Sequence, residues 1–156
     1  MDRKEAYIFA IESEIKSKNL YALLANSCLN EEAKKTFYLL EKMEGIHEEK
    51  LIEAYKKEFN LKSVSFDSTM MPKVDIRRNL SDPKAVLDYA VDRELSMADQ
   101  YEYMAEQSED PEMKKFFESL YREELDHKEL LETELDRIHG TAIWFDESEL
   151  NGLMEY

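Results

Sequence analysis

Apolar residues recur at intervals of three and four positions along four stretches of the chain, which is the spacing of an amphipathic helix. Two of these stretches follow an aspartate–proline pair. Such a pair is typical of a helix start, because the carboxylate caps the helix and proline fits its first position. The pattern predicts helices over about Lys4–Ser27, Glu31–Phe59, Pro83–Gln107 and Pro111–His139.

The connections between these helices predict how they pack. The turns near residues 28–30 and 108–110 are short, and short turns join antiparallel neighbours. Residues 60–80 are mixed in character and long enough to cross the length of a bundle. We therefore expect an all-α, ferritin-like four-helix bundle, made of two helical hairpins joined by a long crossover.

The bundle is expected to occupy residues 1–140, with Gly140 supplying the left-handed residue that ends the last helix. Residues 141–156 form a short tail that contains several large apolar side chains. That tail is apolar enough to dock onto the bundle or onto a second subunit.

Composition narrows the class of protein. A length of 156 residues suits one domain, and a net charge of −15 argues against nucleic acid or an anionic membrane as a partner. Cys28 is the single cysteine, so neither a disulfide framework nor a thiolate metal site can form within the chain. With no apolar run near the ~20 residues that span a bilayer and no signal-peptide pattern, we expect a cytoplasmic location.

The two halves of the chain match each other when one is shifted by 80 positions. The shift places Glu14 on Glu94, Tyr21 on Tyr101, Glu44 on Glu124 and His47 on His127. Each half is one helical hairpin, and neither hairpin can bury its apolar stripe alone. The chain has three histidines, and two of them align.

The spacing within each half places its polar residues at one level. Glu14 and Glu44 lie symmetrically about residue 29, inside the first turn, and the second half repeats this symmetry about residue 109. At ~1.5 Å per helical residue, each glutamate is roughly 20 Å from its turn, level with its partner. Residues three apart share a helix face, so each histidine points the same way as the glutamate before it. The predicted metal ligands are Glu14, Glu44, His47, Glu94, Glu124 and His127.

This donor set indicates which metal is bound. Four carboxylates in one core repel one another, and two divalent cations would cancel their charge. Imidazole with carboxylate suits iron or manganese better than calcium, and the lack of thiolate argues against structural zinc. We expect two iron ions, with manganese or zinc as possible substitutes.

Other side chains near the pattern receive smaller roles. Tyr21 and Tyr101 lie two turns from the glutamates of their own helices, where their hydroxyls can orient a ligand carboxylate on a neighbouring helix; the alternative is simple core packing. His139 has no counterpart in the repeat and is predicted not to be a ligand. Packing roles are expected for Met43, Met97 and Met104, and no role for Cys28.

The segments SEIKSKNLYALLA and EKMEGIH, and their counterparts RELSMADQYEYMA and REELDH, resemble the rubrerythrin group of the ferritin-like superfamily. The resemblance covers all four helices and implies the same six ligands, with the two tyrosines nearby. It also implies a di-iron oxidoreductase that reduces hydrogen peroxide to water and forms a homodimer.

Two departures from that group affect the expected chemistry. Full-length rubrerythrins resemble this chain with an added rubredoxin domain of four cysteines, so we expect the electron donor here to be a separate protein such as a rubredoxin. Rubrerythrins also carry an extra glutamate one turn after the third-helix ligand. Met97 stands at that position here, and Ser17 at its equivalent in the first helix, which puts a redox-linked exchange of ligands in doubt.

The motif leaves other functions open. A ferritin-like ferroxidase or iron-handling protein needs the same six ligands and reacts with dioxygen. A manganese catalase is a third reading, and a non-enzymatic, metal-stabilised bundle that binds a partner through its tail is a fourth.

Overall fold

The structure is a computed structural model that describes residues 1–73, 82–138 and 144–146. Within these residues it contains four helices and no strand: α1 (Arg3–Ser27), α2 (Glu31–Glu58), α3 (Pro83–Glu106) and α4 (Pro111–Asp136). The predicted all-α class is confirmed. None of these four helices is long and apolar enough to cross a membrane.

Each helix starts at a capped residue. A side-chain oxygen of the residue before the helix accepts a hydrogen bond from a backbone N–H of the first turn, which satisfies one of the free donors there. The capping residues are Asp2, Asn30, Asp82 and Asp110. The first helix also has a capping box between Asp2 and Glu5 and begins one residue earlier than predicted.

The helix ends are set by backbone geometry. After α2, Asn60 adopts a φ of 53° and the Leu61 N–H donates to the Lys56 carbonyl at 2.8 Å, a Schellman-type end. The prediction that the fourth helix reaches about His139 was wrong, since α4 ends at Asp136. Its last turn tightens, with the Ile138 N–H donating to the Leu135 carbonyl at 3.2 Å. His139 and Gly140 lie outside the described residues.

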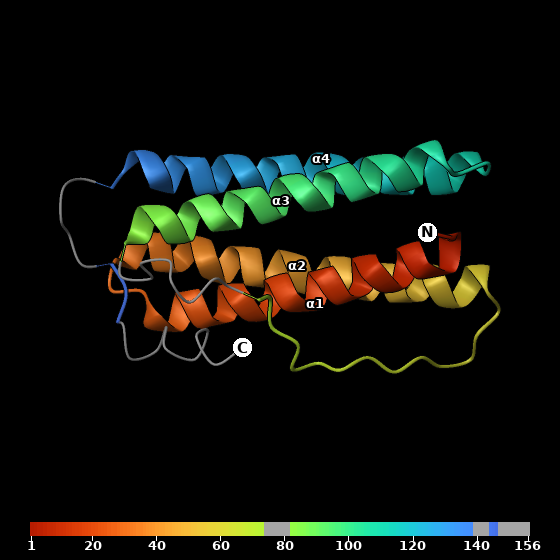
Figure 1. The fold of residues 1–156 in the computed structure, drawn as a ribbon, viewed down its shortest axis with the longest axis horizontal. Coiled ribbons are helices and arrows are strands. Elements are labelled where there is room, and N and C mark those ends of the chain that lie inside the picture. The colour runs from red at the N-terminus through yellow and green to blue at the C-terminus, as the bar shows by residue number, and fades with distance from the viewer. Residues whose placement is uncertain (74–81, 139–143, 147–156) are drawn as a thin grey trace.

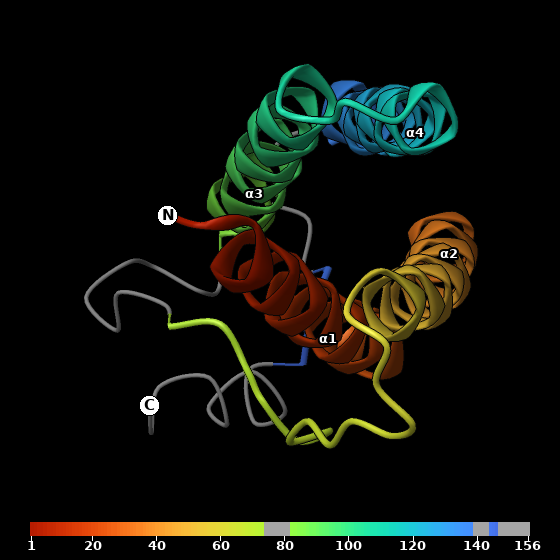
Figure 2. The same cartoon turned by 90° about the vertical axis from the view of Figure 1, so that its right-hand side faces the viewer.

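The four helices form a bundle of two antiparallel hairpins (Figures 1 and 2). α1 pairs with α2 and α3 with α4, while α1 faces α3 and α2 faces α4 across the bundle. This is the predicted hairpin arrangement. Two buried apolar clusters fill the interior, one around Tyr7 and Tyr55 and the other around Leu24 and Phe37.

The crossover between the hairpins runs along the outside of α1 (Figure 1). The side-chain amide of Asn19 donates to the backbone carbonyls of Ser68 and Met70, both at 2.8 Å. Phe66 and Met70 pack against the apolar cluster near Tyr7. The crossover is therefore attached to the bundle over its described part; Arg77 and Arg78 lie outside it.

Part of the C-terminal tail is described and packs on the bundle. Trp144 and Phe145 are buried, and the Phe145 ring lies 5.9 Å from that of Phe37. The Leu29 N–H donates to the Trp144 carbonyl at 2.5 Å, which ties the tail to the turn between α1 and α2. The division of the chain at residue 140 stays a prediction.

Candidate metal centre

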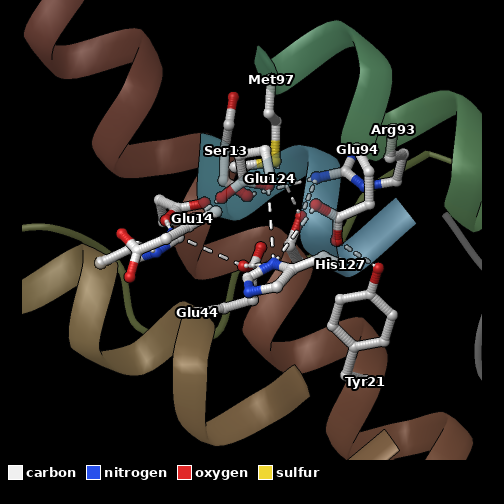
Figure 3. Close-up of polar contacts among 12 residues, drawn as sticks. Ser13, Glu14, Tyr21, Glu44, Arg93, Glu94, Met97, Glu124 and His127 are labelled. Carbon is white, nitrogen blue, oxygen red and sulfur yellow. Dashed lines mark hydrogen bonds and ion pairs between the residues drawn. The ribbon is translucent and has the colours of Figure 1, made fainter. Parts of the chain in front are cut away.

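The six side chains predicted as ligands meet in the middle of the bundle, between the two apolar clusters. Each of the four helices contributes: α1 and α3 one glutamate each, and α2 and α4 a glutamate and a histidine each (Figure 3). None of the six is more than 1% exposed. Residues that are as many as 110 positions apart in the sequence are therefore neighbours in the core.

These side chains form two overlapping groups in which one potential ligand atom per residue lies within 4.8 Å of the others. One group contains Glu14, Glu44, His47 and Glu124, and the other contains Glu44, Glu94, Glu124 and His127. Glu44 and Glu124 belong to both. The arrangement thus provides two adjacent four-residue sites that share two carboxylates.

Both histidines direct Nδ1 at these carboxylates. The Nδ1 of His47 lies 2.7 Å from carboxylate oxygens of Glu14 and Glu124. The Nδ1 of His127 lies 2.9 Å from Glu44 and 3.5 Å from Glu94. The two rings are stacked with centroids 5.4 Å apart, so the two sites are related by the approximate symmetry of the internal repeat.

The hydrogen bonding of the cluster tests whether metal ions fit it. Of the eight oxygens on the four glutamates, seven accept no hydrogen bond from the described residues. The exception is Glu94 Oε1, which accepts one from the Tyr21 hydroxyl. Buried carboxylates without donors are strongly unfavourable unless a cation neutralises them. Two divalent ions would balance four carboxylates and use the free lone pairs, so the residues present fit a di-metal centre.

The carboxylate pKa values show that ionisation of most of the glutamates is unfavourable in the metal-free cluster. Burial, followed by the neighbouring carboxylates, raises the pKa of Glu14 and of Glu124 well above the usual range. Burial and the charge of Glu94 raise the pKa of Glu44 to about 7. Burial also opposes ionisation of Glu94, but its close approach to Glu124 and His127 and the hydrogen bond from Tyr21 outweigh that effect and lower its pKa. The cluster therefore holds protons at neutral pH until cations replace them.

The two histidines differ in protonation. Burial, with the nearby His127, lowers the pKa of His47 to about 3, so His47 is neutral and its nitrogens can act as ligands. Burial also lowers the pKa of His127, but its contacts with Glu44 and Glu94 outweigh that effect and raise it to about 10. A metal ion must displace that proton from His127 before it binds there.

The two predicted tyrosines are both fully buried beside the cluster. Tyr21 on α1 donates to Glu94 on α3 at 2.5 Å, so it contacts a ligand on a neighbouring helix. Tyr101 lies near Glu14, whose charge, after burial, raises the pKa of the Tyr101 hydroxyl. That hydroxyl makes no hydrogen bond within the described residues.

Sequence reasoning missed one residue of the site. Glu123 Oε2 lies 3.3 Å from Nε2 of His47, the nitrogen that faces away from the carboxylates. Neither atom makes a hydrogen bond among the described residues, so Glu123 contributes a nearby carboxylate to the edge of the site. The repeat hides this residue, because its counterpart in the first half is Met43.

Comparisons with known proteins identify a family and a similar fold. The model of the rubrerythrin family matches residues 7–135. The solved structure of a hypothetical protein from Pyrococcus furiosus superposes with a TM-score of 0.75 and 25% sequence identity, covering 87% of this chain and 89% of that one. No curated protein matches the sequence.

Proposed function

The chain belongs to the rubrerythrin family, and from that premise we propose that it is a di-iron oxidoreductase that reduces hydrogen peroxide to water. The observation that carries the proposal is the pair of overlapping sites, with seven glutamate oxygens free of hydrogen bonds. A carboxylate and imidazole donor set of this kind suits iron. Membership of the rubrerythrin family is our reason for proposing peroxide reduction among the reactions that such a centre can support.

The reaction consumes two electrons and two protons for each peroxide that becomes two waters. Two ferrous ions held by the six ligands would supply one electron each and a Lewis-acidic template for the peroxide oxygens. Glu44 and Glu124 belong to both groups, so each of these carboxylates would be available to both ions. Glu14 and Glu94 each complete one site only.

Neighbouring side chains fix the orientation of the ligands. Tyr21 Oη–H holds Glu94 Oε1, so the other oxygen of that carboxylate is left for a metal ion. Glu123 places a further carboxylate oxygen 3.3 Å from Nε2 of His47. The buried site excludes bulk water, which strengthens each of these polar contacts.

The proposal extends to partners. Peroxide reduction needs a supply of electrons, and Cys28 alone cannot hold a rubredoxin-type iron. We therefore assign the donor role to a separate protein such as a rubredoxin. The homodimer and the cytoplasmic location stay predictions from the sequence.

The test is anaerobic loading with Fe(II), followed by stopped-flow absorbance with peroxide and, separately, with dioxygen. Loading should saturate at two iron ions per chain, and Glu44→Ala combined with Glu124→Ala should abolish it. We expect peroxide to oxidise the centre much faster than dioxygen does, with one peroxide consumed per two ferrous ions.

A different outcome would replace the proposal. If dioxygen is the faster oxidant and iron accumulates far beyond two ions per chain, the protein is a ferroxidase of the ferritin type. If manganese binds and peroxide yields oxygen, it is a catalase. Zinc-loaded protein is the control for absorbance changes that do not involve electron transfer, since zinc has no accessible redox chemistry.

A further inference from the structure

Ser17 and Met97 occupy equivalent positions in the two halves of the chain, and the structure brings them into contact. The Ser17 hydroxyl donates to Met97 Sδ at 3.3 Å, across the interface between α1 and α3. Each residue lies one helical turn after a predicted ligand, Glu14 or Glu94. Figure 3 shows the Met97 side chain pointing from α3 toward the cluster. A buried thioether therefore points toward the candidate metal centre.

The groups around this sulfur are hydrogen-bond donors. Arg93 Nη2 donates to the Ser17 hydroxyl at 2.8 Å and to the Ser13 carbonyl at 3.2 Å. Arg93 Nε is buried and has no acceptor among the described residues. A thioether is a weak acceptor, whereas a sulfoxide oxygen is a strong one. The Ser17 hydroxyl, which Arg93 holds in place, thus suits the oxidised form of Met97 better than the reduced form.

We propose that Met97 is a modification site, at which peroxide directed by the iron centre transfers one oxygen atom to the thioether. The inference rests on the peroxide chemistry of the proposed function. The sulfur lone pair attacks one peroxide oxygen, an S–O bond forms and the O–O bond breaks. The proton of the transferred oxygen passes to the leaving hydroxide, so the products are methionine sulfoxide and one water. The sulfur loses two electrons and peroxide gains them, so Met97 serves as the reductant when donor electrons run out.

Burial makes this reaction distinguishable from ordinary oxidation. Met97 is 5% exposed and Met104, on the same helix, is 1% exposed. Met113 is partly exposed and Met1 is 64% exposed. Peroxide acting from bulk solvent should therefore modify Met1 and Met113 first. Oxidation directed by the centre should reverse that order and select Met97.

One tryptic peptide reports on three of these residues. Cleavage after Arg93 and Lys114 releases residues 94–114, which contain Met97, Met104 and Met113. Iron-loaded protein is treated with successive equivalents of peroxide without a donor, then digested and sequenced by tandem mass spectrometry. We expect a gain of about 16 Da, one oxygen atom, to appear at Met97 several-fold more than at Met113 or Met104. Zinc-loaded and metal-free protein are the controls, in which Met113 should be modified before Met97.

Absorbance recorded on the same sample separates this inference from the proposed function. If peroxide oxidises the iron while Met97 stays unmodified, the inference is overturned and the proposed function stands. If Met113 is modified ahead of Met97 whatever the metal, the inference is also wrong. If peroxide neither oxidises the iron nor modifies Met97, both fail. Met97→Leu should still load two iron ions, and the mass gain assigned to residue 97 must disappear.

Discussion

At the scale of residues, the candidate site divides its carboxylates into two kinds. Glu44 and Glu124 belong to both four-residue groups, while Glu14 and Glu94 belong to one each. The sequence separates the glutamates of the two Glu-x-x-His motifs from the other two, but it does not show which carboxylates are shared. The sharing follows from the packing, which places the two Glu-x-x-His helices face to face across the bundle.

The first prediction compares a shared with an unshared glutamate. Glu44→Ala removes a donor from both sites, so metal loading should fall to near zero. Glu14→Ala removes a donor from one site only, and the chain should keep one ion. Both side chains are fully buried, which makes them matched variants. The measurement is zinc stoichiometry by equilibrium dialysis. Equal loss of metal in the two variants would contradict the shared arrangement.

The second prediction concerns pH. The pKa of Glu44 is raised to about 7, and those of Glu14 and Glu124 are also raised. A raised folded-state pKa means that these protons stabilise the metal-free fold at low pH, and this stability is lost as pH rises through the raised values. Metal ions must displace the same protons, so affinity should increase with pH through about 7 and binding should release protons.

Calorimetry measures this release directly. Zinc titrations near pH 6, in two buffers of different ionisation enthalpy, give the number of protons released from the difference in apparent heat. Fewer protons should be released near pH 8, because Glu44 is then already ionised. Release that does not change between the two pH values would show that the cluster is ionised before metal arrives.

The six ligands could be predicted from the sequence because the same pattern of glutamates and histidine occurs in both halves of the chain. The repeat aligns Glu44 with Glu124 and His47 with His127, and chance alignment of two scarce histidines is improbable. Glu123 had no such signal. It occurs in one half only, and on a chain with 36 acidic residues a glutamate beside a ligand is usually solvated surface. Its contact with His47 depends on how α2 and α4 face each other, which spacing along one helix cannot give.

At the scale of elements, the helix starts were more predictable than the ends. A start is fixed by a capping side chain, such as Asp82 or Asp110, that can be recognised in the sequence. The end of α4 is fixed by a local tightening of the backbone after Asp136. The apolar spacing continues through Leu135 and Ile138, so it gave no sign of that end. The end of α2 also depends on the backbone, at the left-handed Asn60.

The third prediction tests that left-handed residue. Asn60 has a φ of 53°, a conformation that glycine adopts freely and alanine resists. Asn60→Ala should destabilise the metal-free protein by about 1 kcal/mol, while Asn60→Gly should be close to neutral or slightly stabilising. Urea unfolding followed by circular dichroism gives both values. Zinc stoichiometry should stay unchanged in both variants, since the site lies more than ten residues away along α2. If the alanine and glycine variants were equally stable, the backbone conformation of residue 60 would not matter for stability.

At the scale of the whole molecule, the metal sites join the two hairpins. Each hairpin packs closely within itself, whereas the contacts between hairpins run along α1 with α3 and α2 with α4 and are sparser. Each four-residue group takes ligands from both hairpins: Glu124 joins three ligands of the first hairpin, and Glu44 joins three of the second. Without cations, the same place concentrates carboxylates that repel one another. The interface between the hairpins should therefore be the part of the fold most sensitive to metal.

The fourth prediction follows from this linkage. Zinc, which cannot transfer electrons, should raise the melting temperature. Free metal at 100 times Kd stabilises the folded state by about 2.7 kcal/mol per site. For a chain of this size, each kcal/mol raises the melting temperature by about 2–4 °C. In the Glu44→Ala, Glu124→Ala variant zinc should have no effect. That variant also lacks two of the four repelling carboxylates, but alanine leaves a cavity at each position. Glu44→Gln with Glu124→Gln removes the same charges and keeps the volume, so the metal-free form of this variant should melt no lower than metal-free wild type. A zinc-induced rise that persists in the glutamine variant would place the stabilising ions elsewhere, and the two hairpins would then be held together by packing alone.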